Sequence, residues 1–381
     1  MAGSAVINVD PNGATGNLAT GNGGGNGGDM CQHAEVNFVP KTPTIFVLVD
    51  RSDSMFVPDS KTQVVNWDPL KAGVLSVVKQ LEGQVNFGFG AFTGQEAQGA
   101  TAAKCPIFDS IAPAINNADA ITAVYPAGRI AGATGQTPVV QVLPLVEKLL
   151  MQPGVEGDKY VLFVTDGEPD FCDNGDSKCP MDAVVAGVQK LASDGIHTIV
   201  FGIGSSIIQE SGAFLQALAN AGASLPAPLP FGANTKEQDA CYACQSIAPW
   251  LAQWTAAGAT HDCATAGQQT LGKYGTAATN ATVYHPDAAD QAKLTAEIAN
   301  VVKGIKSCTF DLGGDISVNL ALLDRASVSI EGQPLPLAQD NGWRMNSPTQ
   351  VELVGSACAT WNDPKSTHID FNFPCDIIVV K

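Results

Sequence analysis

Hydroxyl and carboxylate side chains recur in three segments of this sequence, in an order and spacing that suit a hard metal ion. The first segment carries Asp50, Ser52 and Ser54 at alternate positions, directly after an apolar run. The second carries Thr137 within Gly-Gln-Thr-Pro, and the third carries Asp166 after another apolar run. All these donor atoms are oxygens, which favours Mg²⁺, with Mn²⁺ or Ca²⁺ as alternatives. The sequence therefore predicts a divalent-cation site formed by these five residues.

The apolar segments before the two aspartates predict how the site is positioned. Residues 44–49 and 160–164 are strand-length apolar runs, as expected of central strands in a parallel sheet covered on both faces. Residues 197–203 form a third such run. Loops at the carboxyl ends of neighbouring parallel strands converge in one crevice. We therefore expect the three segments to meet at one edge of the sheet.

Segments with helical spacing of apolar residues alternate with these strands. The predicted helices cover residues 70–81, 138–151, 183–193, 207–220 and 288–305, and further strands are predicted at residues 85–92 and 282–284. Strands that alternate with helices favour right-handed crossovers. The expected fold class is α/β, with a doubly wound, Rossmann-like, mostly parallel sheet and helices on both of its faces.

The character of the sequence changes after Cys308. Short strand-like segments, interrupted by Gly and Pro, predict a small C-terminal all-β domain. These segments are residues 309–312, 317–322, 326–330, 350–354, 369–373 and 377–380. The predicted domains are a flexible Gly/Asn-rich tether at residues 1–30, an α/β domain at residues 31–306 with a cysteine-containing insert at residues 222–280, and the β-domain at residues 307–381.

The charge and hydropathy of the chain exclude two classes of function. The chain has 37 acidic and 20 basic residues and a formal net charge of −17, and an acidic surface repels the phosphates of nucleic acids. No run of about 18 apolar residues occurs, so no transmembrane segment is expected. The flexible N-terminus is instead compatible with a lipid anchor in a cell envelope.

Ten cysteines favour disulfides and therefore an oxidising, extracellular compartment. An export signal is not visible in residues 1–30, and we expect it to have been removed. Cys241-x-x-Cys244 has half the spacing of a zinc site, but no second pair follows. The expected disulfides join Cys172 to Cys179, Cys31 to Cys105 and Cys358 to Cys375, and they leave Cys241, Cys244, Cys263 and Cys308 unassigned. The acid-rich loop at residues 170–179 would then be a disulfide-closed rim, with a second Ca²⁺ site as the alternative.

No catalytic pattern accompanies the metal segments. The five histidines are scattered, and none lies in a Gly-x-Ser-x-Gly or His-Glu-x-x-His context. No nucleophile has a base beside it in the sequence. We therefore expect that this protein is not an enzyme.

The three-part arrangement resembles the metal-ion-dependent adhesion site of von Willebrand factor A domains, and the resemblance covers roughly residues 41–306. It implies that the ion is bound directly by the hydroxyls of Ser52, Ser54 and Thr137. It also implies that Asp50 and Asp166 act mainly through water. A Glu or Asp side chain of a partner then completes the coordination of the ion.

Two positions qualify this resemblance. The residue between the two serines is often Gly in the family, whereas here it is Asp53, which adds a negative charge beside the site. Thr134 is a rival for Thr137. Thr137 is preferred, because Gly-x-Thr-Pro at the start of a helix is the usual form in the family.

The C-terminal third carries a second resemblance. Ser-Cys-Thr-Phe at residues 307–310, Gly342-Trp343 and the segments that hold Cys358 and Cys375 look like the tail of secreted A-domain proteins of myxobacteria and their relatives. Several of those are outer-membrane lipoproteins, and one is a gliding-motility adhesin. The resemblance implies a cell-surface adhesion module, associated with the outer membrane, that coordinates an acidic group of an extracellular protein or surface ligand.

Two alternatives to an adhesion module remain open from the sequence. One is a structural subunit of a surface assembly, in which the metal only stabilises the fold. The other is a secreted metal-dependent hydrolase. Fold-level resemblance alone does not separate these functions.

Overall fold

The chain forms two compact units in this computed structural model. The structure describes residues 4–9, 38–40, 42–94, 105–131, 135–170, 172, 178–205, 207, 211–231, 271–287, 290–305, 307–312, 316–338, 340–362, 366, 368–374 and 377–380. The first unit, Thr44–Asn300, is called the α/β unit below, and the second, Met1–Pro43 with Val301–Lys381, is called the β unit. The predictions for Cys241, Cys244, Cys263 and Thr134 lie outside the described residues.

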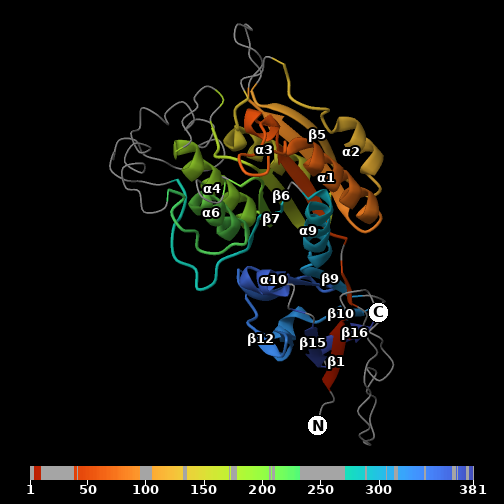
Figure 1. Cartoon of the computed structure of the whole chain (residues 1–381). Coiled ribbons are helices and arrows are strands. Elements are labelled where there is room, and N and C mark those ends of the chain that lie inside the picture. Colours follow the sequence, from red (N-terminus) through yellow and green to blue (C-terminus); the bar gives the residue numbers. More distant parts are fainter. Residues whose placement is uncertain are drawn as a thin grey trace, which may run out of the picture. The chain divides into compact units, whose positions relative to one another are not determined.

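Six strands form the central sheet of the α/β unit, in the order β5-β4-β3-β6-β7-β8 (Figure 1). They are β3 (Thr44–Asp50), β4 (Asn86–Thr93), β5 (Ile107–Ala114), β6 (Lys159–Thr165), β7 (Ile196–Gly202) and β8 (Val283–Tyr284). Neighbouring strands pair in parallel except β4 and β5, which are antiparallel. The expected doubly wound, mostly parallel sheet is therefore confirmed.

Helices cover both faces of this sheet (Figure 1). In the described part they are α1 (Trp67–Leu81), α2 (Ala118–Val124), α3 (Val139–Leu150), α4 (Lys178–Ser193), α6 (Gly212–Gly222) and α9 (Gln291–Gly304). Side chains alternate along a strand, so Phe46 and Leu48 of β3 face one side, where they join a core cluster with α3, α4 and α6. On the other side Phe89 of β4 stacks on Tyr125, and Tyr125 contacts Trp67 of α1. None of the described helices combines the length and apolarity needed to cross a membrane.

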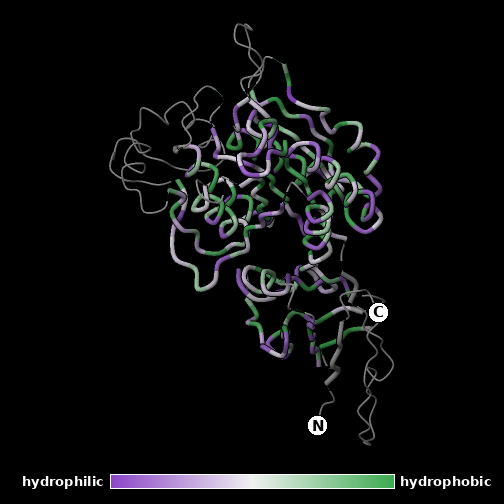
Figure 2. The backbone as a smooth tube through the Cα atoms, viewed as in Figure 1, coloured by the Kyte–Doolittle hydropathy of each residue, from purple (hydrophilic) through white to green (hydrophobic). Residues whose placement is uncertain are grey.

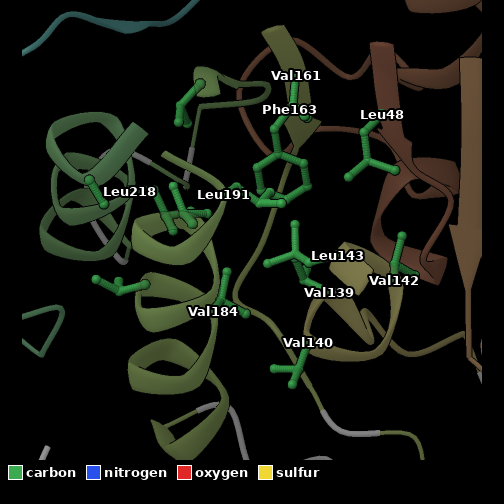
Figure 3. Packing of buried hydrophobic residues seen from close by; sticks show 14 of the residues in the cluster. Leu48, Val139, Val140, Val142, Leu143, Val161, Phe163, Val184, Leu191 and Leu218 are labelled. Carbon is green, nitrogen blue, oxygen red and sulfur yellow. The ribbon is translucent and has the colours of Figure 1, made fainter. Parts of the chain in front are cut away.

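The core cluster under α3, α4 and α6 holds the strands that carry the predicted metal segments. Figure 3 shows Leu48 of β3 and Phe163 of β6 beside Leu143 of α3 and Val184 of α4. Each of these side chains is at most 4% exposed, and truncating one to alanine would remove about 2–5 kcal/mol of stability. The helices that cover the sheet contain both hydrophobic and hydrophilic residues (Figure 2), as expected of helices that bury one face and expose the other. The site therefore stands on a rigid scaffold.

The antiparallel strand β5 and the short helix α2 were not predicted. In β5 only Ile107 is buried, because the strand lies at the edge of the sheet. An edge strand of this kind lacks the apolar alternation that identifies a strand in sequence. Within the predicted helix at residues 207–220, Ile207 is helical and α6 starts at Gly212 after its N-cap, Ser211, whereas residues 208–210 lie outside the described residues.

Short antiparallel sheets form the β unit, as the C-terminal sequence predicts. Their orders are β1-β15-β11-β12, β13-β14-β9-β2 and β10-β16. The strands are β1 (Ser4–Val9), β2 (Phe38–Pro40), β9 (Thr309–Leu312), β10 (Ile316–Val318), β11 (Ser327–Ile330), β12 (Gln333–Leu335), β13 (Gly342–Ser347), β14 (Gln350–Val354), β15 (Ile369–Pro374) and β16 (Ile378–Val380), with helix α10 (Ser356–Trp361). A second core, which includes Phe310, Trp343 and Phe371, holds this unit together.

The N-terminal part of the chain differs from the predicted division into domains. Ser4–Val9, within the predicted tether, forms β1 and pairs with β15. Phe38–Pro40, assigned by sequence to the α/β domain, forms β2 and pairs with β9 in the β unit. Apolar residues inside β1, such as Val6 and Ile7, supply a strand signal that the surrounding Gly and Asn obscure. The rest of the predicted tether lies outside the described residues.

All three expected disulfide pairs are wrong. Cys105 bonds to Cys172, with a Cα–Cα distance of 5.9 Å. Cys308 bonds to Cys358 of α10, with a Cα–Cα distance of 5.5 Å. Both bonds join cysteines at least 50 residues apart. Such partners come together only in the folded chain, so their spacing in the sequence does not identify them. Disulfides of this kind persist in oxidising compartments, which agrees with the expected location.

Candidate metal centre

The predicted metal segments lie where the strand order of the sheet reverses. Within the sheet, β4 and β5 follow β3 in the chain and lie on one side of it. The next strands, β6 and β7, lie on the other side of β3. Asp50 is the last residue of β3, and Asp166 directly follows β6. Because β3 and β6 are neighbouring parallel strands, both aspartates lie at the same carboxyl edge, at a topological switch point of the kind where ligands bind.

Asp50 is fully buried, and both of its carboxylate oxygens accept hydrogen bonds. Oδ1 accepts from the backbone N–H of Ser52 at 2.7 Å. Oδ2 accepts from the hydroxyl of Thr165, the last residue of β6, at 2.7 Å. The carboxylate is thereby fixed between the loop that follows β3 and the end of β6.

A chain of side-chain hydrogen bonds continues from the first segment to the third. The hydroxyl oxygens of Ser52 and Ser54 lie 2.9 Å apart. The hydroxyl of Ser54 donates to Oδ1 of Asp166 at 2.7 Å. Ser54 lies in the single-turn helix Asp53–Phe56. Four of the five predicted ligands are thus joined in one cluster.

Backbone contacts bring the second segment to the same place. The N–H of Asp53 donates to the carbonyl of Gly135 at 3.0 Å. The N–H of Asp170, after β6, donates to the carbonyl of Thr137 at 2.9 Å, and Oδ2 of Asp170 accepts from the N–H of Thr137 at 3.3 Å. These bonds fix the backbone of Thr137, which is buried just before α3. All three segments therefore converge as the sequence predicts.

The two aspartates carry more negative charge than their surroundings compensate. Burial raises the pKa of Asp50 above its ordinary value, against the hydrogen bonds that lower it. Burial also raises the pKa of Asp166, and the neighbouring charge of Asp50 raises it further. Within the described residues, no Lys, Arg or His forms an ion pair with either carboxylate. An ionised carboxylate that is removed from water raises the free energy of the folded protein. Binding a cation or taking up a proton relieves this cost.

The donor set fits a hard divalent cation. Within the described residues no three His, Cys, Asp or Glu side chains group closely enough to hold a metal ion by themselves, so an ion here would also need the hydroxyl oxygens. Two carboxylates and the hydroxyls of Ser52 and Ser54 are oxygen donors of the type that Mg²⁺, Mn²⁺ and Ca²⁺ prefer. Solvent reaches the cluster at Ser54, which is exposed, whereas Asp50 and Ser52 are buried.

Two arginines beside the cluster escaped the sequence analysis. Arg51 is 7% exposed, and its Nη1 donates to Oδ2 of Asp109 on β5 at 2.9 Å. Its Nε and Nη2 both donate to the carbonyl of Gly128, Nε at 2.7 Å. Arg129, the next residue, bonds through Nη2 to Oδ2 of Asp53. The sequence does show a cationic residue, Arg51, within the segment of the predicted metal ligands. It shows no pattern that would identify Arg129.

Gly135 makes room for the carboxylate of Asp53. A Cβ atom on Gly135 would lie 2.1 Å from Cγ of Asp53, and the φ angle of Gly135 is +68°. Both the contact and the backbone conformation require glycine at this position. The non-glycine residue between the two serines is therefore accommodated by the facing segment.

Asp59 supports the segment that follows the metal loop. Oδ1 accepts from the N–H groups of Lys61 and Thr62, each at 2.9 Å. Ser205, in the loop after β7, donates its N–H to Oδ2 at 2.6 Å and its hydroxyl to Oδ1 at 3.0 Å. Burial raises the pKa of Asp59, but these hydrogen bonds outweigh it and hold the pKa far below its ordinary value.

The chain is similar to solved protein structures, but it matches no family model and no curated sequence. The pilus adhesin SpaC of Lactobacillus rhamnosus GG is 14% identical over 90% of this chain and 39% of its own, with a TM-score of 0.37. The manganese-loaded TRAP protein of Plasmodium vivax is 18% identical over 45% of this chain and 61% of its own, with a TM-score of 0.33. Proximal thread matrix protein 1 of the mussel byssus, with zinc in its MIDAS motif, is 18% identical over 44% of this chain and 37% of its own, with a TM-score of 0.31.

The chain spans about two fifths of the length of the SpaC adhesin that it matches.

Proposed function

We propose that the α/β unit is a metal-dependent adhesion or protein-binding module of the von Willebrand factor A type. In this proposal one divalent cation is held by Asp50, Ser52, Ser54, Thr137 and Asp166, with Mg²⁺ as the first candidate and Mn²⁺ or Ca²⁺ as alternatives. When bound, the cation offers an open coordination position to an acidic group of a partner. The partner is an extracellular protein or surface ligand that presents Glu or Asp, and the module binds it without catalysing a reaction.

The observation that carries this proposal is the uncompensated carboxylate pair. Burial raises the pKa values of both Asp50 and Asp166, the charge of Asp50 raises that of Asp166 further, and the charge of Asp170 raises that of Asp50. Hydroxyl groups, rather than cationic side chains, surround both carboxylates within the described residues. A fold that only needed to bury these groups would neutralise them with an ion pair, whereas a cation site must leave them available.

The exposure of the cluster supports a binding role over a purely structural one. Asp50 and Ser52 are buried, Asp166 is half-buried and Ser54 is exposed. A structural metal site is closed by protein ligands on all sides, as structural zinc sites are. A site that solvent reaches leaves a position for a ligand from outside.

The location belongs to the same proposal. The two described disulfides fit an oxidising compartment. We propose a cell-surface position, associated with the outer membrane, with a lipid anchor at the N-terminus. A lipid-labelling experiment on the protein from its native host would show such an anchor as an incorporated fatty acid.

Binding to immobilised Glu- and Asp-containing peptides tests the adhesion function directly. We expect the Mg²⁺-loaded chain to bind these peptides and to ignore the matched Gln and Asn peptides. Asp166→Asn should abolish the binding. Asp119→Asn removes a carboxylate whose side chain is 99% exposed on α2, so it serves as the control and should bind as the wild type does.

Chelation separates the adhesion module from the structural subunit. With EDTA, the adhesion module should lose peptide binding while the α/β unit still unfolds cooperatively. A chain that loses its cooperative unfolding in EDTA, and binds no acidic peptide in Mg²⁺, would contradict the proposal and favour the structural role.

A further inference from the structure

An arginine stands at the rim of the metal loop. Nη2 of Arg129 bonds to Asp53, which lies between the two serines of the cluster. The side chain of Arg129 is 53% exposed, and that of Asp53 is 39% exposed. The guanidinium group therefore lies at the surface beside the oxygen donors of the proposed cation.

Two cationic side chains, the buried Arg51 and the half-buried Lys71, fix the segment that carries Arg129. Arg51, directly after Asp50, donates from two nitrogens to the carbonyl of Gly128. Nζ of Lys71 on α1 donates to the carbonyls of Tyr125 at 3.3 Å and Pro126 at 3.0 Å. Three carbonyls within four residues thus accept hydrogen bonds from Arg51, which directly follows β3, and from Lys71 of α1. The position of Arg129 next to the metal loop is a built feature of the fold.

The bond to Asp53 occupies only part of the N–H donors of the Arg129 guanidinium group. A guanidinium group has five N–H donors, and Nη2 is the nitrogen that Arg129 uses in its contact within the described residues. Asp53 also donates its own N–H to Gly135, so its backbone is fixed independently of Arg129. Donors of Arg129 therefore remain for a ligand, without the metal loop having to come apart.

We propose that Arg129 binds a second carboxylate of the partner, so that the site selects an acidic peptide segment with two carboxylates close together. The inference rests on the proposed function, because the first carboxylate is the one taken by the cation. Asp53 holds the guanidinium in place before binding and competes with the second carboxylate for it. Arginine suits this task, because its planar fork can bond two carboxylates at once.

An exposed apolar residue beside the cluster favours a peptide over an acidic polysaccharide. Val57 is 58% exposed, and its N–H donates to the carbonyl of Ser54 at 3.1 Å. It therefore lies one turn from a proposed metal ligand. A peptide can place an apolar side chain next to its carboxylates, whereas a chain of uronic acids offers none.

Two short peptides test the second contact. One carries two glutamates, Gly-Glu-Gly-Glu-Gly, and the other replaces one of them with glutamine. In Mg²⁺, Arg129→Gln should weaken binding of the two-glutamate peptide about fivefold to tenfold. Binding of the one-glutamate peptide should change less than about twofold, as expected of one remote surface charge. Lys148→Gln, an equal charge change at an exposed position on α3, should leave both affinities unaltered.

The role of Asp53 gives the inference a second, independent readout. Asp53→Asn frees Arg129 and removes a repelling charge, so it should strengthen binding of the two-glutamate peptide. Arg129→Gln should still weaken that binding in the Asp53→Asn background. If the effect of Arg129→Gln vanishes there, Arg129 only neutralises Asp53, and the proposed second contact is wrong.

The remaining outcomes separate this inference from the proposed function. If the wild type binds neither peptide in Mg²⁺, the proposed function fails. If it binds both peptides equally, and Arg129→Gln changes neither affinity, only the second contact fails. If polygalacturonate binds more tightly than the two-glutamate peptide and depends on Arg129, the assignment to a peptide is overturned.

Discussion

Two groups of carboxylates in the α/β unit are enclosed in different ways. Asp59 is 9% exposed and accepts five hydrogen bonds from Lys61, Thr62 and Ser205. Its pKa lies far below the ordinary value, although burial raises it. Asp50 and Asp166 are held by fewer donors, and burial raises the pKa values of both, with the charge of Asp50 raising that of Asp166 further.

The difference shows which carboxylates the fold uses for itself. Asp59 is satisfied by its own chain and ties the segment after the metal loop to the loop after β7. Hydrogen bonds also position Asp50 and Asp166, but no cationic side chain compensates their charge within the described residues. The same residue type is a structural tie in one place and an incomplete cation site in the other.

Replacement of Asp59 with asparagine should give the largest change in stability. Asp59→Asn removes the charge that strengthens five hydrogen bonds and places an amide group against the N–H donors. We expect the free energy of unfolding at about pH 7 to fall by about 2–3 kcal/mol. Chemical denaturation followed by circular dichroism measures this change. A loss below about 0.5 kcal/mol would mean that Asp59 is no structural tie.

The contribution of Asp59 should also depend on pH in a defined direction. Its pKa is lower in the folded chain than the ordinary 3.8, so it stabilises the fold while ionised. That stabilisation is complete above pH 3.8 and is lost as the pH falls toward the folded pKa. The difference in unfolding free energy between wild type and Asp59→Asn should shrink by about 1 kcal/mol from about pH 7 to about pH 3. The difference between wild type and Asp119→Asn should stay constant, and a widening gap for Asp59→Asn would refute the assignment.

The same chemical change at Asp166 should have the opposite sign. In EDTA at about pH 8, Asp166→Asn removes repulsion from Asp50 and keeps an oxygen that accepts from Ser54. We expect the unfolding free energy to rise by about 1 kcal/mol. Denaturation of wild type and variant side by side measures the sign. Destabilisation comparable to that of Asp59→Asn would remove the contrast between the two groups.

The fold and most of the candidate site could be predicted from sequence, because buried parallel strands have a strong signature. The apolar runs that precede Asp50 and Asp166 placed both aspartates after strands, and parallel pairing of β3 with β6 brings their ends together. Thr137 was predicted from its position before a helix, which α3 confirms. The placement of the two aspartates needed only local pattern and the rule that strand ends share an edge, whereas the choice of Thr137 over Thr134 came from the family resemblance.

Contacts between distant segments could not be predicted in the same way. The pairing of Cys105 with Cys172 depends on where two loops end up in space. The bond between Arg129 and Asp53 likewise joins residues 76 positions apart. The strand at Ser4–Val9 exists because β15 offers it a partner. Nothing local in the sequence encodes these partners, so they require the folded structure.

Calorimetric titration of Mg²⁺ into the metal-free chain at about pH 8 tests the central claim most directly. We predict that one ion binds per chain and that Asp166→Asn weakens this binding by at least about 30-fold. Asp59→Asn, once shown to be folded, should stay within about threefold of wild type. If wild type gives no binding heat with Mg²⁺, Mn²⁺ or Ca²⁺, or if Asp166→Asn binds as wild type does, the carboxylate pair is not a cation site.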